Sequence, residues 1–395
     1  MTAIDSISVP CPFDAHVHLR QPGELLELVV TQIHGGGIQS VYVMPNTVPP
    51  LTTVEMATSY RDTLQSLEPS IQFFVSLYLS PSLTPDEIRK AKVCGIAGVK
   101  SYPRGVTTNS AEGVESYEIY YPVFEAMEQE NLVLNIHGEV PSSETGDICV
   151  WNAESKFLPK LLEIHRRFPK LRIILEHATT RDAVEAVKAC GPTVACTITL
   201  HHLSLTIDDW AGNGLNYCKP VAKSPDDREA LRQVIREGHP RFFLGSDSAP
   251  HPLHRKLPNT TSQCCAAGIY TTAYLLPTLA AIFESAIPPS LVAQGKQVPA
   301  RKIHSPIPLD RLPDFASNFG RTFYDLPAPK SPRTVTLIRN PSASIQDAFT
   351  YQYSRSPAEI LDENLAGKSS QTQSQKNNIS LVPYWAGRNV GWEIQ

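Results

Sequence analysis

Short, nearly uninterrupted apolar runs recur along the first part of the chain, and turn residues bound each run. Strands with one solvated face alternate between apolar and polar positions, whereas continuous apolar runs indicate parallel strands that helices cover. The eight runs are a segment around Val9–His18, then Gln39–Asn46, Ile71–Ser80, Gly95–Tyr102, Leu132–Gly138, Arg172–His177, Pro192–Thr199 and Arg241–Asp247.

Helical patterns separate these runs, at Glu24–Ile33, Val54–Leu67, Pro85–Lys92, Tyr120–Gln129, Ser155–Phe168, Arg181–Ala189 and Asp226–Glu237. Eight strands alternating with helices predict an α/β fold, a (β/α)8 TIM-type barrel. The alternative, a doubly wound sheet, would place a glycine-rich turn directly after the first strand. Gly35–Gly37 instead follow a helical pattern and precede a strand, so we expect them to end a helix.

The pattern changes after about residue 285, where Pro288–Pro313 is rich in proline. We therefore predict a barrel domain over residues 1–330 and a C-terminal extension over residues 331–395. Within the extension, residues 367–378 contain no apolar side chain, which predicts a polar surface loop. The apolar tail Leu381–Ile394 is expected to pack back on the barrel.

One uncharged stretch, Ala266–Phe283, is long enough as a helix to reach across a membrane, at about 27 Å. Pro277 interrupts it and three threonines dilute its apolar character. We therefore predict a buried helix of a large soluble domain rather than a membrane span.

Composition narrows the classes of function. Of 395 residues, 42% are hydrophobic and 19% charged, and the formal net charge is −4. That balance argues against nucleic acid or an anionic membrane as the main partner. The eight cysteines form no C-x-x-C pair, so we expect reduced thiols, with Cys264 and Cys265 buried. Met1–Pro10 lacks the features of a signal peptide, and a cytoplasmic location follows as an expectation.

The segment Asp14-Ala-His16-Val-His18 carries the first candidate chemistry. Residues i and i+2 of a strand point to the same face, so His16 and His18 can face one metal ion. A lone H-x-H motif is weak evidence, but further polar residues end other predicted strands, where barrel enzymes place their catalytic groups. These are Lys100, His137, His177 and Asp247.

Neutral imidazoles together with a carboxylate suit zinc. For any one of these residues, a hydrogen-bonded buried histidine or a helix-capping aspartate is the simpler interpretation. Because all of these residues lie at equivalent positions at the ends of predicted strands, a shared metal site is the better interpretation of the whole group. Lys100 is different, because a protonated amine cannot coordinate a metal. Carbamylation by CO₂ would convert it into a carboxylate able to bridge two ions, whereas a surface lysine is the alternative, and Lys100 alone does not decide between them.

With these motifs the chain resembles the amidohydrolase superfamily and, more narrowly, the monofunctional class of dihydroorotases. The resemblance covers most of the chain and rests on FDAHVHLRQ, VMPNTVPPLTT, VKSYPRGVTTNSAEGV, IHGEV, LEHATT, LGSDSAPH and LVPYWAG. It implies one zinc ion on His16, His18 and Asp247, and a second on His137 and His177. It further implies that an N6-carboxylated Lys100 bridges the two ions.

The resemblance also implies substrate contacts. Arg20 and Asn46 would bind the carboxylate of dihydroorotate, and a guanidinium suits that task because it offers a bidentate fork. Thr107 and Thr108 would lie in a mobile loop that closes over substrate. The simpler interpretations are a surface charge for Arg20 and ordinary loop polarity for the threonines. Further implied substrate contacts are His137, His251, Lys219 and Ala267, the last two through the main chain; bacterial relatives carry an apolar residue in place of Lys219.

The implied enzyme is a zinc-dependent cyclic amidohydrolase that interconverts N-carbamoyl-L-aspartate and (S)-dihydroorotate in de novo pyrimidine (UMP) biosynthesis. A zinc-bridging hydroxide would be the nucleophile and Asp247 the general acid and base. The alternatives are another cyclic amidohydrolase, such as a hydantoinase or allantoinase, and a non-catalytic scaffold that has lost its metals. Arg20 argues against a neutral hydantoin ring, and the full ligand set argues against the scaffold. Soluble members of this family are commonly dimers, so we expect a homodimer.

Overall fold

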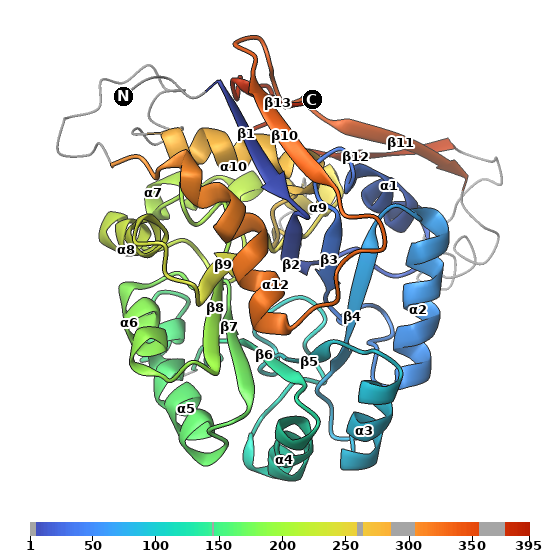
Figure 1. Ribbon diagram of the computed structural model, residues 1–395, viewed down its shortest axis with the longest axis vertical. Coiled ribbons are helices and arrows are strands. Elements are labelled where there is room, and N and C mark those ends of the chain that lie inside the picture. Colours follow the sequence, from blue (N-terminus) through green and yellow to red (C-terminus); the bar gives the residue numbers. More distant parts are fainter. Residues whose placement is uncertain (1–4, 144–145, 259–263, 286–304, 355–375) are drawn as a thin grey trace.

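The computed structural model describes residues 5–143, 146–258, 264–285, 305–354 and 376–395. Eight parallel strands form one sheet in chain order, with helices outside it, as Figure 1 shows. The predicted (β/α)8 barrel is thereby confirmed. The strands are β2 (Phe13–Val17), β3 (Ser40–Val43), β4 (Gln72–Tyr78), β5 (Gly98–Ser101), β6 (Val133–His137), β7 (Arg172–Glu176), β8 (Val194–Ile198) and β9 (Phe242–Leu244).

The barrel closes between its first strand and the segment that follows its last one. Val17 forms a parallel bridge with Ser248. The N–H of His18 donates to the carbonyl of Ser248 at 3.0 Å, and the N–H of Asp247 donates to that of His16 at 2.9 Å. These bonds bring β2 and the end of β9 together at the carboxyl end of the barrel.

Helices follow the strands where the sequence predicts them, and side-chain caps explain several of their starts. The hydroxyls of Thr53, Thr84, Thr180 and Ser224 accept hydrogen bonds from main-chain N–H groups of the first turn. The helices that match predicted patterns are α1 (Glu24–Gln32), α2 (Val54–Leu67), α3 (Pro85–Val93), α4 (Tyr121–Gln129), α5 (Ala153–Arg167), α6 (Arg181–Ala189) and α8 (Pro225–Arg236).

The expected helix stop at Gly35–Gly37 is confirmed, because α1 ends at Gln32. Gly37 has a φ of 85°, which favours glycine. At Gly36 a Cβ would lie 1.8 Å from the carbonyl oxygen of Thr272, so only glycine allows this close approach.

A compact apolar cluster fills the barrel below the site. Alternate strand residues supply it, and Tyr324 of α12 (Phe319–Tyr324) joins it from outside the strands. The polar side chains at the carboxyl end of the barrel therefore lie next to a packed apolar layer inside the barrel. The cluster comprises Phe13, Ala15, Tyr42, Met44, Phe74, Val133, Ile174, Ala195, Phe243 and Tyr324.

The two ends of the chain meet in a separate antiparallel sheet, in which β10 (Thr334–Arg339) lies between β1 (Ser6–Pro10) and β13 (Trp392–Ile394). A second pair is formed by β11 (Phe349–Ser354) and β12 (Lys376–Leu381), which Figure 1 shows beside α1. The division of the chain at residue 330 stays a prediction. Most of the predicted polar loop lies outside the described residues, and positions 376–378 belong to β12.

The uncharged stretch after residue 266 forms a helix only in its second half, as α10 (Leu275–Glu284), whose residues are largely buried. The predicted helix began too early, since Ser248 bridges Ile269 and Gly268 has a φ of 148°. In the part of the chain that the structure describes, no helix has both the length and the apolar character needed to span a bilayer. The expected burial of the cysteine pair is wrong for Cys264, which is exposed, while Cys265 is partly buried.

Candidate active site

A pocket of about 370 Å³, open to solvent, lies where the barrel strands end. Nearly all of the site residues proposed from sequence line it, together with Tyr102, Ala249 and Gly268. The sequence-derived lining residues are His16, His18, Arg20, Asn46, Thr107, Thr108, His137, His177, Lys219, Asp247 and Ala267. Of the other two, Lys100 is fully buried, and His251 lies beside Arg20.

Three of these residues form a compact group of potential metal ligands: His16, His18 and Asp247. The carboxylate oxygen Oδ1 of Asp247 lies 3.3 Å from Nε2 of His16 and 3.1 Å from Nε2 of His18. All three residues are buried. His16 lies in β2 and His18 follows the strand directly, and both rings face Asp247, as the i, i+2 spacing predicts.

The hydrogen bonds of both rings suit a cation between them and Asp247. Nδ1 of His16 lies 2.7 Å from a carboxylate oxygen of Glu176, and Nδ1 of His18 lies 2.8 Å from Oδ1 of Asn46. Both partners can only accept, so each Nδ1 carries the hydrogen. With a hydrogen on Nδ1, the nitrogen that faces Asp247 is Nε2, which can hold either a second hydrogen or a cation against the carboxylate oxygen.

The pKa values of His18 and Asp247 are both lowered, so at neutral pH both groups are in the protonation states that bind a metal. Burial lowers the pKa of His18 from 6.5 to about 4, so its ring is neutral at pH 7. Burial raises the pKa of Asp247, but hydrogen bonding with His18 and the attraction of His16 and His18 outweigh it. The pKa of Asp247 is therefore held below its ordinary value, and the carboxyl group is ionised. Neutral imidazoles and a carboxylate are what zinc binds.

Glu176 fixes the orientation of His16 through a buried polar network. Its Oε1 accepts from Nδ2 of Asn135 at 2.6 Å, and its Oε2 accepts from the hydroxyl of Thr197 at 2.5 Å as well as facing His16. Carboxylates that hold the second nitrogen of a metal-ligating histidine set its tautomer and ring direction. Sequence reasoning missed Glu176, and its position directly before His177 was the available signal.

His137 has a similar carboxylate partner. Its Nε2 lies 2.8 Å from Oε2 of the buried Glu139, which leaves Nδ1 as the free ring nitrogen. The ring of His137 lies 4.6 Å from that of His177, and His177 lies 5.1 Å from His16, measured between ring centroids. The four histidines thus form a continuous group across the strand ends. Sequence reasoning also missed Glu139, two residues after His137.

Lys100 lies in β5, one residue before the end of the strand, and has no exposed surface. Its Nζ has no hydrogen-bond partner among the described residues and lies 4.9 Å from the ring centre of Tyr102. Burial lowers the pKa of Lys100 from 10.5 to about 8, against the opposing attraction of Glu176 and Asp247. A buried amine without a partner is costly, which suits a side chain that is completed by a further group.

Three of the site residues have positive φ angles, a backbone conformation that is unfavourable for residues other than glycine. The φ angles are 74° for Arg20, 42° for His177 and 48° for Asp247. Non-glycine residues with positive φ cost free energy and cluster at functional sites. The surrounding hydrogen bonds, such as that from the N–H of His177 to the hydroxyl of Thr197 at 2.7 Å, hold this geometry.

Arg20 extends along one wall of the pocket. Its Nε donates to the carbonyl of Pro250 at 2.8 Å, and its Nη2 lies 3.1 Å from Nε2 of His251. The same His251 nitrogen lies 2.9 Å from the carbonyl of Ala267. Burial lowers the pKa of Arg20 from 12.5 to about 10, so the guanidinium stays charged at neutral pH. A fixed cation therefore faces the space beside the metal ligands.

The loop that contains Thr107 and Thr108 lines part of the pocket, and hydrogen bonds to its main chain hold it there. Nδ2 of Asn46 donates to the carbonyl of Thr108 at 3.0 Å, and Nδ2 of Asn109 donates back to the carbonyl of Asn46 at 2.9 Å. Nζ of Lys219 donates to the carbonyl of Val106 at 2.8 Å. Asn46 thus connects this loop with His18, a link that sequence reasoning did not foresee.

Comparison with known proteins gives consistent matches over the whole chain. The dihydroorotase of Mycosarcoma maydis is 47% identical over 419 residues, covering 99% of each chain, and that of Saccharomyces cerevisiae is 40% identical over 406 residues with the same coverage. The crystal structure of the Saccharomyces cerevisiae dihydroorotase in complex with 5-fluoroorotic acid superposes with a TM-score of 0.81, at 38% identity and 99% coverage of both chains. No family model matches the chain.

Proposed function

The chain belongs to the dihydroorotase family, and from this premise we propose that it interconverts N-carbamoyl-L-aspartate and (S)-dihydroorotate in de novo pyrimidine biosynthesis. In the biosynthetic direction a carboxyl carbon bonds to the carbamoyl nitrogen and one water leaves. The observation that carries the proposal is the joint presence of a fixed cation, Arg20, and the buried ligand group of His16, His18 and Asp247 at one pocket. That pairing suits an anionic cyclic amide.

We propose that two zinc ions bind at this site, because the donor set fits them. His16, His18 and Asp247 would hold one ion, and His137 and His177 the other. The Nε2 atoms of His16 and His18, both directed at Oδ1 of Asp247, support the first position. When bound, the ions would polarise the reacting carbonyl and lower the pKa of water to about 7.

Lys100 is proposed to bridge the two positions as an N6-carboxylated side chain. Its amine would attack CO₂, a carbon–nitrogen bond would form, and the amine would lose one proton. The lowered pKa makes the neutral amine accessible near pH 8. The missing partner of Nζ and the complete burial support a side chain that ends in a carboxylate rather than an ammonium group.

Asp247 is proposed as the general acid and base. In hydrolysis its carboxylate would take a proton from the attacking water and give it to the departing amide nitrogen. In ring closure the protonated carboxyl group would return that proton to the leaving oxygen. Asp247 is ionised at neutral pH and lies at the pocket wall, so it can start the hydrolytic direction as a base.

The substrate carboxylate is proposed to bind Arg20, Asn46 and His251. Nδ2 of Asn46 uses one hydrogen on the carbonyl of Thr108 and retains a second for substrate. His137 would add a side-chain contact, and Lys219 and Ala267 main-chain contacts. The homodimer and the cytoplasmic location remain predictions.

A substrate panel tests this function. Zinc-loaded protein should hydrolyse dihydroorotate, an anion, far faster than the neutral rings of hydantoin and allantoin. Arg20→Met should lower kcat/KM for dihydroorotate by about 10- to 100-fold, since a hydrogen bond to a charged group is lost. The exposed Arg89→Met serves as control and should leave the rate unchanged. Preference for hydantoin or allantoin would contradict the proposal and favour the corresponding amidohydrolase, and inactivity with all three would favour a scaffold.

A further inference from the structure

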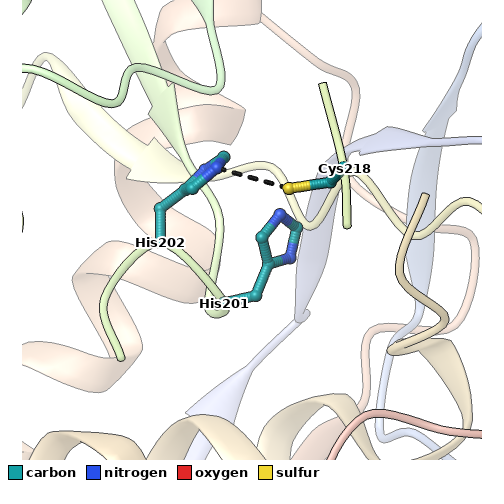
Figure 2. A group of neighbouring side chains, drawn as sticks. All are labelled: His201, His202 and Cys218. Atoms are coloured by element: carbon teal, nitrogen blue, oxygen red, sulfur yellow. Dashed lines mark hydrogen bonds between the residues drawn. The ribbon is translucent and has the colours of Figure 1, made fainter. Parts of the chain in front are cut away.

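A second group of potential metal ligands occurs among the described residues: His201, His202 and Cys218. The two histidines follow β8, and Cys218 lies directly before Lys219. All three are buried, and one ligand atom from each lies within 4.8 Å of the others. None of them lines the pocket, so this group is separate from the ligands described above. Figure 2 shows the three side chains converging from different directions.

One distance matches the edge of a tetrahedral site. Nε2 of His202 lies 3.7 Å from Sγ of Cys218. Two such atoms on one zinc ion are about 3.6 Å apart, given bonds of about 2.3 Å to sulfur and about 2.0–2.1 Å to nitrogen. The carbonyl oxygen of Pro220 accepts a hydrogen bond from that nitrogen at 3.0 Å and from the Cys218 thiol at 3.2 Å. A cation that replaces these two hydrogens would have the same oxygen as a fourth donor.

His201 gives an independent sign that a ligand is missing. It has no exposed surface, and within the part of the chain that the structure describes neither of its ring nitrogens has a hydrogen-bond partner. Burying an imidazole without partners is unfavourable, and each unpaired polar atom costs about 1–3 kcal/mol. An ion between His201, His202 and Cys218 would satisfy one of these nitrogens directly.

His202 is held in the orientation that such an ion needs. Its Nδ1 lies 2.9 Å from the hydroxyl of Thr199, and the same hydroxyl accepts from the main-chain N–H of His202 at 3.0 Å. Nε2 is thereby directed at Cys218. The hydroxyl of Thr199 can either donate to Nδ1 or accept from it, so a bound cation would select the tautomer with the hydrogen on Nδ1 and the lone pair on Nε2.

We propose that His201, His202 and Cys218 bind one thiophilic divalent cation, with Zn²⁺ as the occupant tested, and that the carbonyl of Pro220 completes the site. The sulfur–hydrogen bond of Cys218 breaks, a metal–sulfur bond forms, and the proton goes to solvent. Both imidazoles bind in their neutral forms, so each ion releases one proton. Such a closed site is structural, because all four positions are filled by the protein. It would tie the end of β8 to the segment that presents Lys219 to the pocket.

The cysteine ligand gives the site a distinct spectroscopic signature, because Cys218 would bind as a thiolate and sulfur is absent from the ligands proposed for the active site.

Cobalt(II) substitution tests the proposal in the whole protein. The proposed active-site ligands are nitrogen and oxygen atoms only, so a near-ultraviolet sulfur-to-cobalt charge-transfer band reports a thiolate ligand elsewhere. We expect about three metal ions per chain and this band in the wild type. Cys218→Ala should remove the band and one ion. Cys196→Ala, which changes another buried free cysteine on β8, should keep both.

Three results would overturn the proposal. The first is a fully loaded wild type without the band, which needs no variant and so holds even where Cys218→Ala fails to fold. The second is a band that survives Cys218→Ala. The third is a band lost in Cys264→Ala, which would assign it to adventitious binding at the exposed cysteine. Dihydroorotase activity is measured separately, so failure of this site and failure of the proposed function are distinguishable.

Discussion

The main-chain N–H of Asp247 donates to the carbonyl oxygen of His16 at 2.9 Å. This bond joins the two ends of the barrel sheet at the level where both side chains face the same space. The positions of the His16 and Asp247 side chains therefore depend on closure of the barrel. An ion bound by both side chains would in turn stabilise the closed barrel. Ligands from opposite ends of the sheet thus form a single site.

Asp247→Asn should reduce kcat in both directions by about 10²- to 10⁴-fold, because an amide cannot carry the proton. The amide should also bind zinc more weakly. Steady-state rates and metal analysis on the same preparation check both effects. Asp208→Asn, a change at an exposed aspartate, is the matched control and should behave as the wild type. Full activity of Asp247→Asn would assign the acid and base role to another group.

Lys100→Ala should abolish turnover and weaken binding of the zinc pair, since the proposed bridge is lost. Adding a small carboxylic acid should restore part of the activity, because it can replace the missing carboxylate. Lys92→Ala removes an exposed lysine of α3 and should change neither property. Near-native turnover of Lys100→Ala without added acid would show that Lys100 is not the bridge.

Replacing Thr107 and Thr108 together by Val should lower the rate strongly and leave zinc content and Tm almost unchanged. The hydroxyls are lost, whereas the main-chain contact from Asn46 to Thr108 is kept. Loss of a contact made only over bound substrate costs about 1–3 kcal/mol. Kinetics, metal analysis and a melting curve test this expectation. Unchanged kinetics would show that the two hydroxyls do not contribute to catalysis. A large loss of zinc would show that the loop has a structural role instead.

The metal-free protein should lose stability as the pH falls below about 6.5. Several buried histidines have pKa values lowered by burial, so the unfolded chain binds more protons than the folded one in this range. Each such group lowers the free energy of unfolding by up to about 1.4 kcal/mol per pH unit until its folded pKa is passed, near pH 4 for His18. The groups are His18, His137, His177, His201, His202 and His251.

Urea unfolding of metal-free protein at pH 7.0 and at pH 5.5 measures this effect. A lower midpoint at pH 5.5 is expected. The exposed His34 provides a control, because His34→Gln should leave the difference between the two midpoints unchanged. Equal midpoints at the two pH values would contradict the assignment of lowered pKa values to these buried rings.

The barrel and the main site residues could be predicted because their signals are local. Strand periodicity alone places His16 and His18 on one face, and a position at a strand end brings His137, His177 and Asp247 to the same edge of the sheet. Each of these inferences needs only the residues of one strand. The start of α10 was missed because the extended segment around Ile269 is set by a contact with Ser248, which the local pattern does not contain.

The supporting contacts could not be predicted, because they join residues far apart in sequence. Glu176 meets His16 across 160 positions, and Nζ of Lys219 reaches Val106 across 113. Such pairs depend on the register of the barrel and on the course of its loops. The link from His18 through Asn46 to Thr108 likewise requires three segments to meet.

The most direct test of the proposed function follows one zinc-loaded preparation and one zinc-stripped preparation with N-carbamoyl-L-aspartate and, separately, with dihydroorotate. The proposal predicts that the loaded protein converts each compound into the other and reaches the same final ratio from both sides. It also predicts that the stripped protein converts neither and recovers when zinc is restored. Loaded protein that leaves both compounds unchanged, or stripped protein that turns them over at the full rate, would contradict the proposal.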